Sequence, residues 1–347
     1  MKKLIGLLVT MSVVVAVFCV TVTGQQSCKV PFHAAYYSLY YLVLYPPTPL
    51  GANNCLPDGP WSVECQVQSW VCPPHPDKVC PFCPDSGSPI ALSTGNTYIE
   101  QTDARLPGLA RGLELTRVWN SRTGVAQGLF GRGWRSNYEE AIFVDSEGYV
   151  DYWRGDGSIW SFGFYGLDPA GSGYSVYWLA APANRGATFQ TGATYWTVTF
   201  KDGEKRLFDI ASGRLTSIVD RNGNTTQLTY DNLNRLSVVT DPAARHLYFN
   251  YGVSGNLVQT VTTDFGISLT YTYDGQQRLT QVTYPDSTFK TFEFDANSFV
   301  TAVKDSQGKV LESHTYNTCG QGLTSSRAGG VEALSVTYPL GCGLELP

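Results

Sequence analysis

The stretch LTYDNLNRL, from Leu228 to Leu236, has a near copy in YTYDGQQRL, from Tyr271 to Leu279. Each copy carries Tyr-Asp, three further residues and then Arg-Leu. An aspartate after the tyrosine can bond its own backbone two residues on, which begins a loop. The pattern therefore predicts one strand that ends at the tyrosine and a second strand that returns at the leucine.

The motif recurs along the second half of the chain with a spacing of 21 or 22 residues. Its aromatic positions are Phe208, Tyr230, Tyr251, Tyr273, Phe294, Tyr316 and Tyr338. The other motif residues are Asp209, Asp231, Arg235, Leu236, Asp274, Arg278, Leu279 and Asp295. A second turn signal, such as Asp220-Arg-Asn-Gly223, lies about halfway through most units. The spacing predicts an internal repeat with two short strands in each unit.

The alternation within a unit predicts which face of each strand is buried. Ile267, Leu269, Tyr271 and Tyr273 share one face, and the residues between them are Ser or Thr. We expect the motif arginine to pair with the aspartate or to cover an aromatic ring. A catalytic Tyr/Asp/Arg set is the alternative, but a site that is used once needs no copy in every unit.

Composition agrees with a mostly β protein. The 347 residues are 43% hydrophobic and 15% charged, so the chain has enough apolar side chains for a core and is not disordered as a whole. It has 35 Gly, 19 Pro and 21 Tyr but only 2 Met, which favours turns and strands over helices. The net charge of −5 provides no basic footprint for nucleic acid, and we expect no nucleic-acid partner.

The N-terminus predicts export. Lys2 and Lys3 precede an apolar stretch from Leu4 to Val22, and small residues suited to a signal peptidase lie before Gln25. The mature chain is expected to be secreted or on the cell surface, with membrane contact only through this signal. An uncleaved anchor remains the alternative.

The cysteines outside the signal number eight, and disulfides are the usual state of cysteines in an exported chain. Zinc is the alternative, because Cys72-Pro-Pro-His75 and Cys80-Pro-Phe-Cys83 have ligand-like spacing. A bridge between the last two cysteines would join the last two repeat units, although equivalent positions in neighbouring units are too far apart for a relaxed disulfide. The disulfide candidates are Cys28, Cys55, Cys65, Cys72, Cys80, Cys83, Cys319 and Cys342.

Three segments upstream of the repeats carry a resemblance to a known family. They are GSPIALSTGNTYIEQTDARLPG (87–108), LELTRVWNSR (113–122) and GLFGRGWRSNYEE (128–140). Together with the Tyr-Asp repeats, they resemble the Rhs/YD-repeat family. The resemblance implies repeats that wind a spiral β-sheet shell, which in larger members encloses a toxic domain. Arg117 and Trp134 belong to these segments, and we expect both to be packed and not to bind a ligand.

The expected fold is therefore mostly β, with antiparallel hairpin repeats that form part of a spiral sheet. The expected organisation is a signal (1–24), a Cys- and Pro-rich module (25–86), an Rhs-type domain that precedes the repeats (87–145), a β-rich connecting segment (146–207), the repeats (208–342) and a tail (343–347).

The motifs predict no enzyme, no cofactor and no bound metal, and His246 and His314 lie in different repeats. The expected function is that of an exported structural or cell-surface interaction protein. Self-association or a protein partner is expected through strand addition at Ala333–Tyr338, with the concave face of the short arc partly wet. One alternative is a degenerate fragment of a contact-dependent toxin. Another is a carbohydrate-binding module that recognises a cell-surface glycan through Trp153, Trp160, Trp178 and Trp196.

Overall fold

The computed structural model describes residues 89–91, 94–122, 127–144, 149–181, 186–252 and 255–338. These residues form antiparallel β-structure with two short 3-10 turns, at Leu109–Arg111 and Ala328–Gly330. The expected fold class is confirmed. Within the described part of the chain, no helix has the length and apolar character needed to cross a membrane.

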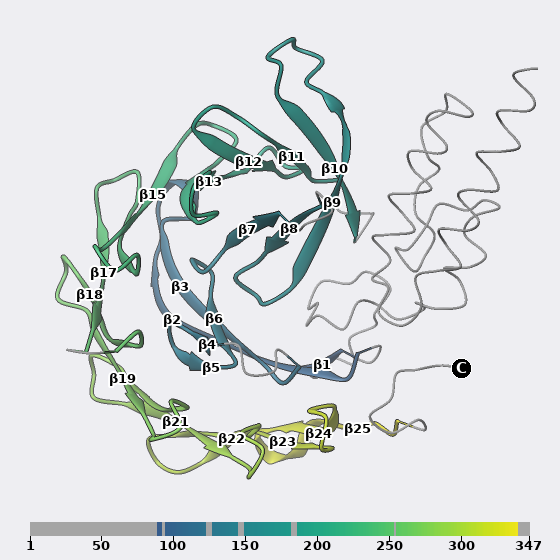
Figure 1. Ribbon diagram of the computed structural model, residues 1–347. Helices are drawn as coiled ribbons and strands as arrows, with labels where there is room; N and C mark the ends of the chain where they lie inside the picture. The colour runs from purple at the N-terminus through teal and green to yellow at the C-terminus, as the bar shows by residue number, and fades with distance from the viewer. Residues whose placement is uncertain are drawn as a thin grey trace, which may run out of the picture.

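A small sheet lies at the centre of the molecule (Figure 1). Its strand order is β1-β2-β3-β6, and a two-stranded ribbon of β4 and β5 lies between β3 and β6 in the sequence. The strands are β1 (Ile90–Ala91), β2 (Asn96–Leu106), β3 (Leu113–Asn120), β4 (Gln127–Gly128), β5 (Gly131–Arg132) and β6 (Trp134–Ser136).

A second, much longer sheet curves around the small one. Each of its strands pairs antiparallel with the next in sequence, and the segment expected to connect the two parts, residues 146–207, is continuous with the repeats in this sheet. Its first strands are β7 (Ala141–Val144), β8 (Val150–Trp153), β9 (Ile159–Leu167), β10 (Ser175–Ala181), β11 (Thr188–Gln190) and β12 (Tyr195–Thr199). The repeat strands are β13 (Lys205–Asp209), β14 (Leu215–Val219), β15 (Thr225–Tyr230), β16 (Leu236–Thr240), β17 (His246–Tyr251), β18 (Val258–Thr263), β19 (Ser268–Tyr273), β20 (Leu279–Thr283), β21 (Phe289–Phe294), β22 (Val300–Asp305), β23 (Val310–Tyr316), β24 (Gly322–Arg327) and β25 (Val331–Ser335).

The first coil of the long sheet, from β7 to the start of β14, closes on itself. The Ile142 amide at β7 donates to the Gly213 carbonyl at 2.7 Å, and the Leu215 amide donates to the Glu140 carbonyl at 3.3 Å. An isolated bridge between Ala141 and Arg214 lies at the same seam. From β14 onward the sheet runs as an open arc around β2, β3 and β6 (Figure 1).

The repeat units consist of two strands each, as the spacing predicts. Tyr230 at the end of β15 pairs with Leu236 at the start of β16, and Tyr273 pairs with Leu279 in the same way. A register shift next to each tyrosine adds one residue to the returning strand. Such bulges bend a sheet and increase its twist, which agrees with an arc.

The concave face of the arc is packed, so the expectation that it is partly wet is wrong. Leu269, Leu279 and Val282 on this face are each at most 1% exposed. The small sheet covers them: Trp119 lies edge-on to Tyr316 with ring centroids 6.0 Å apart, and Trp134 lies edge-on to Phe292 at 5.0 Å. The small sheet supplies the apolar cover that repeats alone lack.

The last described strand begins and ends earlier than expected. β25 spans Val331–Ser335, whereas the sequence alternation indicated residues 333–338. β25 pairs antiparallel with β24, with a register shift between Ser325 and Arg327, and the Val336 amide continues this edge by donating to the Leu323 carbonyl. The predicted signal (1–24), the Cys- and Pro-rich module (25–86) and the tail (343–347) lie outside the described residues.

Candidate functional site

The motif tyrosines join neighbouring repeat units through their hydroxyls. The Tyr273 hydroxyl donates to the Val258 carbonyl at 2.6 Å, and that carbonyl belongs to the first strand residue after the preceding motif loop. Equivalent bonds run from Tyr230 to Leu215, from Tyr251 to Leu236, from Tyr316 to Val300 and from Tyr338 to Gly322, at 2.6 to 3.0 Å. Phe208 and Phe294 occupy the same position without a hydroxyl.

The motif aspartates fold the loop between the two strands. The Asp231 carboxylate accepts from the amides of Leu233 at 2.9 Å and Arg235 at 2.8 Å, and Asp274 accepts in the same way from Gln276 and Arg278. Burial raises the pKa of Asp231, but the hydrogen bonds from Arg235 outweigh it, so the net pKa lies below the usual value. Asp295 makes the same two backbone bonds, while Asp209 accepts from the amide and hydroxyl of Ser212.

Each motif arginine contacts both the aspartate of its own loop and the aromatic ring of the next unit. The Arg235 guanidinium donates to the Asp231 carboxylate at 2.8 Å and lies 4.2 Å from the ring centroid of Tyr251 in the next unit. Arg278 pairs with Asp274 at 2.6 Å and lies 4.9 Å from the ring centroid of Phe294. The arginine therefore fastens its own loop and also covers the next aromatic ring.

A buried ion pair fastens the small sheet to the arc. Asp103 on β2 and Arg117 on β3 have fully buried side chains and make two hydrogen bonds, the longer at 2.9 Å. The Tyr271 hydroxyl from β19 donates to the same carboxylate at 2.9 Å. The guanidinium lies 4.5 Å from the ring centroid of Trp134, so Arg117 and Trp134 are packed, as the sequence predicts.

The two described histidines of the repeats are not paired with a hydroxyl nucleophile. His314 on β23 lies opposite Ser325 on β24, with Glu312 nearby, which is the residue set of a hydrolytic triad. However, neither ring nitrogen of His314 nor the Ser325 hydroxyl makes a hydrogen bond, and both residues are 2% exposed. His246 lies elsewhere, on β17, and its Nδ1 contacts Asp264 at 2.8 Å. The described part of the chain also contains no group of three or more His, Cys, Asp or Glu that could hold a metal ion.

Of the four tryptophans proposed for glycan binding, the three with described side chains pack against neighbouring residues. Trp160 is 4% exposed beneath the Arg154 guanidinium, which lies 4.4 Å from its ring. Trp153 is half-buried between Phe143 and Arg135, and Trp196 is half-buried against Phe189. The side chain of Trp178 lies outside the described residues.

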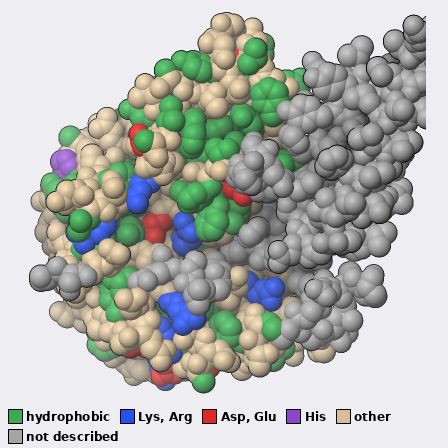
Figure 2. Space-filling view, in the orientation of Figure 1, with side chains coloured by type: hydrophobic (Ala, Val, Ile, Leu, Met, Phe, Trp, Pro, Cys, Tyr) green, Lys and Arg blue, Asp and Glu red, His purple; other side chains and the backbone are tan. Residues whose placement is uncertain are grey.

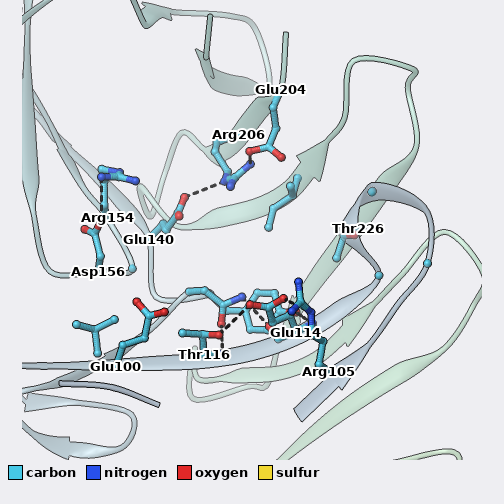
Figure 3. Close-up of a pocket in the computed structure, with 18 of the residues that line it drawn as sticks. Glu100, Arg105, Glu114, Thr116, Glu140, Arg154, Asp156, Glu204, Arg206 and Thr226 are labelled. Atoms are coloured by element: carbon cyan, nitrogen blue, oxygen red, sulfur yellow. Dashed lines mark hydrogen bonds and ion pairs between the residues drawn. The ribbon is translucent and has the colours of Figure 1, made fainter. Parts of the chain in front are cut away.

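A polar cavity of about 940 Å³ lies between the small sheet and the first coil, and we call it the polar chamber. One wall carries Glu100, Glu114 and Thr116 from β2 and β3, as Figure 3 shows. The opposite wall carries Glu140 and Arg206, with Arg206 on β13. Basic and acidic side chains also lie close together toward the middle of the face in Figure 2.

The charges on the second wall form a compact network. Arg206 donates to Glu140 at 3.1 Å and to Glu204 at 2.6 Å, and the Tyr152 hydroxyl donates to Glu140 at 2.5 Å. Arg154 pairs with Asp156 at 2.8 Å. Burial lowers the pKa of Arg206, but the neighbouring carboxylates outweigh it and the net shift is upward.

Sequence reasoning missed the polar chamber. Glu140 and Arg206 are 66 residues apart, and closure of the first coil brings them together. The strand alternation was the available signal, because Glu114 and Thr116 alternate with buried Leu115 and Arg117 on β3. That signal marks a polar face but does not say what lies opposite it.

Most cysteine predictions lie outside the described residues. These are the candidates Cys28, Cys55, Cys65, Cys72, Cys80, Cys83 and Cys342, together with the alternative zinc site. Cys319, in the loop after β23, is disulfide-bonded. Its pairing with Cys342 stays a prediction.

Two family models match the chain. One, described as "RHS Repeat", matches residues 208–246 and 253–288. The other, described as "Domain of unknown function (DUF6531)", matches residues 87–162. The matched ranges contain the motif loops at Asp209, Asp231 and Asp274 and the buried Asp103–Arg117 pair.

Curated relatives match over a limited part of their length. The tRNA3(Ser)-specific nuclease WapA of Bacillus spizizenii is 28% identical over 145 residues, which is 42% of this chain and 6% of the relative. The tRNA nuclease WapA of Bacillus subtilis (strain 168) is 26% identical over a match with the same shares. The matched region thus spans a small fraction of the relatives' length.

Solved structures similar to part of this chain include TcdB2-TccC3 and the N-terminal domain of SpvB. The crystal structure of TcdB2-TccC3 has a TM-score of 0.35 and 12% identity, covering 64% of this chain and 16% of that chain. The N-terminal domain of the effector protein SpvB from Salmonella typhimurium strain LT2 has a TM-score of 0.32 and 15% identity, covering 59% of this chain and 98% of that chain.

The family models agree with the repeat geometry: each described unit is a two-stranded hairpin whose motif aromatic closes its loop, and most of these aromatics bond back to the preceding unit. Residues 208–246 and 253–288 are therefore RHS repeats, and the resemblance of this chain to the Rhs/YD-repeat family is confirmed over its matched segments.

Proposed function

We propose that this chain is an exported structural protein that builds part of a β-shell and interacts with other proteins, without catalytic turnover of its own. The observation that carries the proposal is the use of the motif side chains. Tyr273, Asp274 and Arg278 all bond or stack within the sheet, and the concave face packs against the small sheet. Side chains that hold a scaffold together in this way are not available to bind a substrate.

The proposed interaction is strand addition at β25. Among the described strands, β25 pairs with β24, and four of the five β25 residues are exposed, including Val331 at 59%. Backbone groups along such an edge can pair with a strand from another chain. Because the Val336 amide points toward β24, alternation along the strand turns the Ala333 amide outward.

A proline scan of this edge tests the proposed interaction. Ala333→Pro removes an outward donor and is expected to abolish self-association or partner binding measured by light scattering on the purified chain. Ala296→Pro is the matched control, because Ala296 follows Asp295 as Pro242 follows Asp241 in an equivalent loop. A chain that stays monomeric at micromolar concentration and captures no partner, or one whose association survives Ala333→Pro, would contradict strand addition.

The relatives favour a second candidate, in which this chain is the shell part of a nuclease toxin. Its support is the 145-residue match to proteins named as tRNA nucleases. On this proposal the shell itself does not cleave RNA, because His314 and Ser325 make no hydrogen bonds that would assemble a base and a nucleophile. Incubating the purified chain with tRNA is expected to leave it intact, and cleavage products above a buffer control would show turnover.

Export and disulfides complete the proposal. The Lys2-Lys3 signal pattern and the cysteines of residues 25–86 support an oxidising compartment. Intact mass with and without reductant is expected to show bridges in this module, and non-reducing peptide mapping is expected to join Cys319 to Cys342. One equivalent of zinc with free thiols would instead support the metal alternative.

A further inference from the structure

The polar chamber has more negative than positive groups among its described lining residues. Its carboxylates are Glu100, Glu114, Glu140, Asp156 and Glu204. Its guanidiniums are Arg105, Arg154 and Arg206, so five acids face three bases and two negative charges are in excess. Charges that face each other across a partly enclosed cavity are less screened than charges on an open surface.

Each of the three guanidiniums is already paired with a carboxylate of the same lining. Arg206 binds two of them, Glu140 and Glu204, and Arg154 binds Asp156. Arg105 pairs with Glu114 at 3.1 Å, but its side chain is 72% exposed, so this pair is weaker. An anionic ligand would have to displace these carboxylates, whereas a cation can join the network.

A second, independent feature points into the same space. Thr226 on β15 is 2% exposed, and its hydroxyl makes no hydrogen bond. Thr226 pairs in register with Ile218 on β14, and both residues line the polar chamber. A buried hydroxyl without a partner is destabilising, and a ligand that donates an N–H group would satisfy it.

The size of the polar chamber suits an occupant larger than a bare metal ion. A volume of about 940 Å³ is that of a site for an organic molecule or a short peptide segment. The described residues also contain no group of three or more His, Cys, Asp or Glu that could hold a metal ion. The side chains that line the cavity therefore fit a ligand that brings its own positive charge and its own N–H donors.

We propose that the polar chamber binds an organic cation that carries primary ammonium groups, with Glu204 and Thr226 as two of its contacts. A free polyamine and a lysine side chain of a peptide share this chemistry. The site is separate from the β25 edge, so its test does not depend on the proposed scaffold function.

Calorimetric titration of the full chain with spermidine, and separately with the tripeptide Lys-Gly-Lys, tests the proposal. We expect saturable binding of at least one probe, and the stronger of the two identifies the source of the ammonium group. Glu204→Gln is expected to weaken binding by about tenfold, as loss of a charge-assisted hydrogen bond does. Thr226→Val is expected to weaken binding severalfold while it leaves stability unchanged or raised, because it removes an unsatisfied hydroxyl.

The control variant is Glu293→Gln, which removes one negative charge from an exposed position that pairs with Lys304 outside the polar chamber. It is expected to leave affinity unchanged. Absence of saturable binding by both probes at millimolar concentration would overturn the proposal. Equal weakening by Glu293→Gln and Glu204→Gln, or equal binding of the neutral sugar maltotriose, would overturn it as well, because each would show that the excess negative charge does not select the ligand.

Discussion

Removing or adding one hydroxyl at the motif aromatic position should change stability in opposite directions. Tyr273→Phe deletes the 2.6 Å bond to the Val258 carbonyl, and Val258 is fully buried. Phe294→Tyr is the inverse change. Phe294 lies 15 residues after Leu279, the same separation that joins Tyr273 to Val258, so the new hydroxyl should reach the Leu279 carbonyl.

The magnitudes follow from the burial of the acceptor. A net intramolecular hydrogen bond contributes about 0.5 to 1.5 kcal/mol, and a buried carbonyl left without its partner costs about 1 to 3 kcal/mol. We expect Tyr273→Phe to lower the free energy of unfolding by about 1 to 2 kcal/mol. Phe294→Tyr should raise it by about 0.5 to 1 kcal/mol, because the Arg278 guanidinium over the ring remains in place.

Urea unfolding followed by tryptophan fluorescence measures both changes. The matched control is Tyr248→Phe, which removes a hydroxyl that donates to Asp264 in an exposed bond at 2.8 Å. That substitution should change the free energy of unfolding by less than about 0.5 kcal/mol. If Tyr273→Phe costs no more than Tyr248→Phe, and Phe294→Tyr matches the parent chain, the hydroxyls do not hold the repeat units together.

Three further predictions concern other parts of the framework. Arg117→Met leaves the Asp103 carboxylate buried and unpaired and should cost about 3 to 5 kcal/mol in urea unfolding, whereas the double change with Asp103→Leu should cost less. Gly266→Ala places a side chain at φ 76° and should cost about 1 kcal/mol by the same assay, while Gly275→Ala, in open space without a positive φ, should be near neutral. Burial raises the pKa of Asp241, but its bonds to Arg245 outweigh burial and set the pKa below the usual value. The carboxylate therefore stabilises the fold above about pH 4, and this stabilisation is lost as pH falls through the folded pKa. In thermal melts, Asp241→Asn should be less stable than the parent chain at neutral pH and should lose less stability on acidification.

The repeat half of the fold was predictable because its information is local. The Tyr-Asp turn, the returning leucine and the alternation of β19 all act within one unit of about 21 residues. The loop bonds of Asp274 and the pairing of Arg278 also lie within five residues of each other in sequence. Short-range chemistry of this kind can be inferred from a single sequence.

The packing of the concave face was not predictable in the same way. The error came from treating the arc as a sheet whose interior the chain leaves open. Asp103 and Tyr271 are 168 residues apart, and no local pattern in either segment indicates that one covers the other. The buried Arg117 carried a partial signal, because a charged residue among apolar alternating positions needs a partner of opposite charge.

The two faces of the small sheet explain why the centre of the molecule is packed on one side and hollow on the other. On β3, Leu115 and Arg117 face the arc and are fully buried, whereas Glu114 and Thr116 line the polar chamber. A sheet that served only to fill the interior would gain stability from apolar residues on both faces, since each buried Leu or Val contributes about 1.5 to 3 kcal/mol. The opposite wall is polar as well. Arg206 on β13 lines the polar chamber, although Phe208 on the same strand is fully buried. Matching polar faces on elements more than 60 residues apart in sequence favour a cavity that admits a polar ligand over a gap left by poor packing.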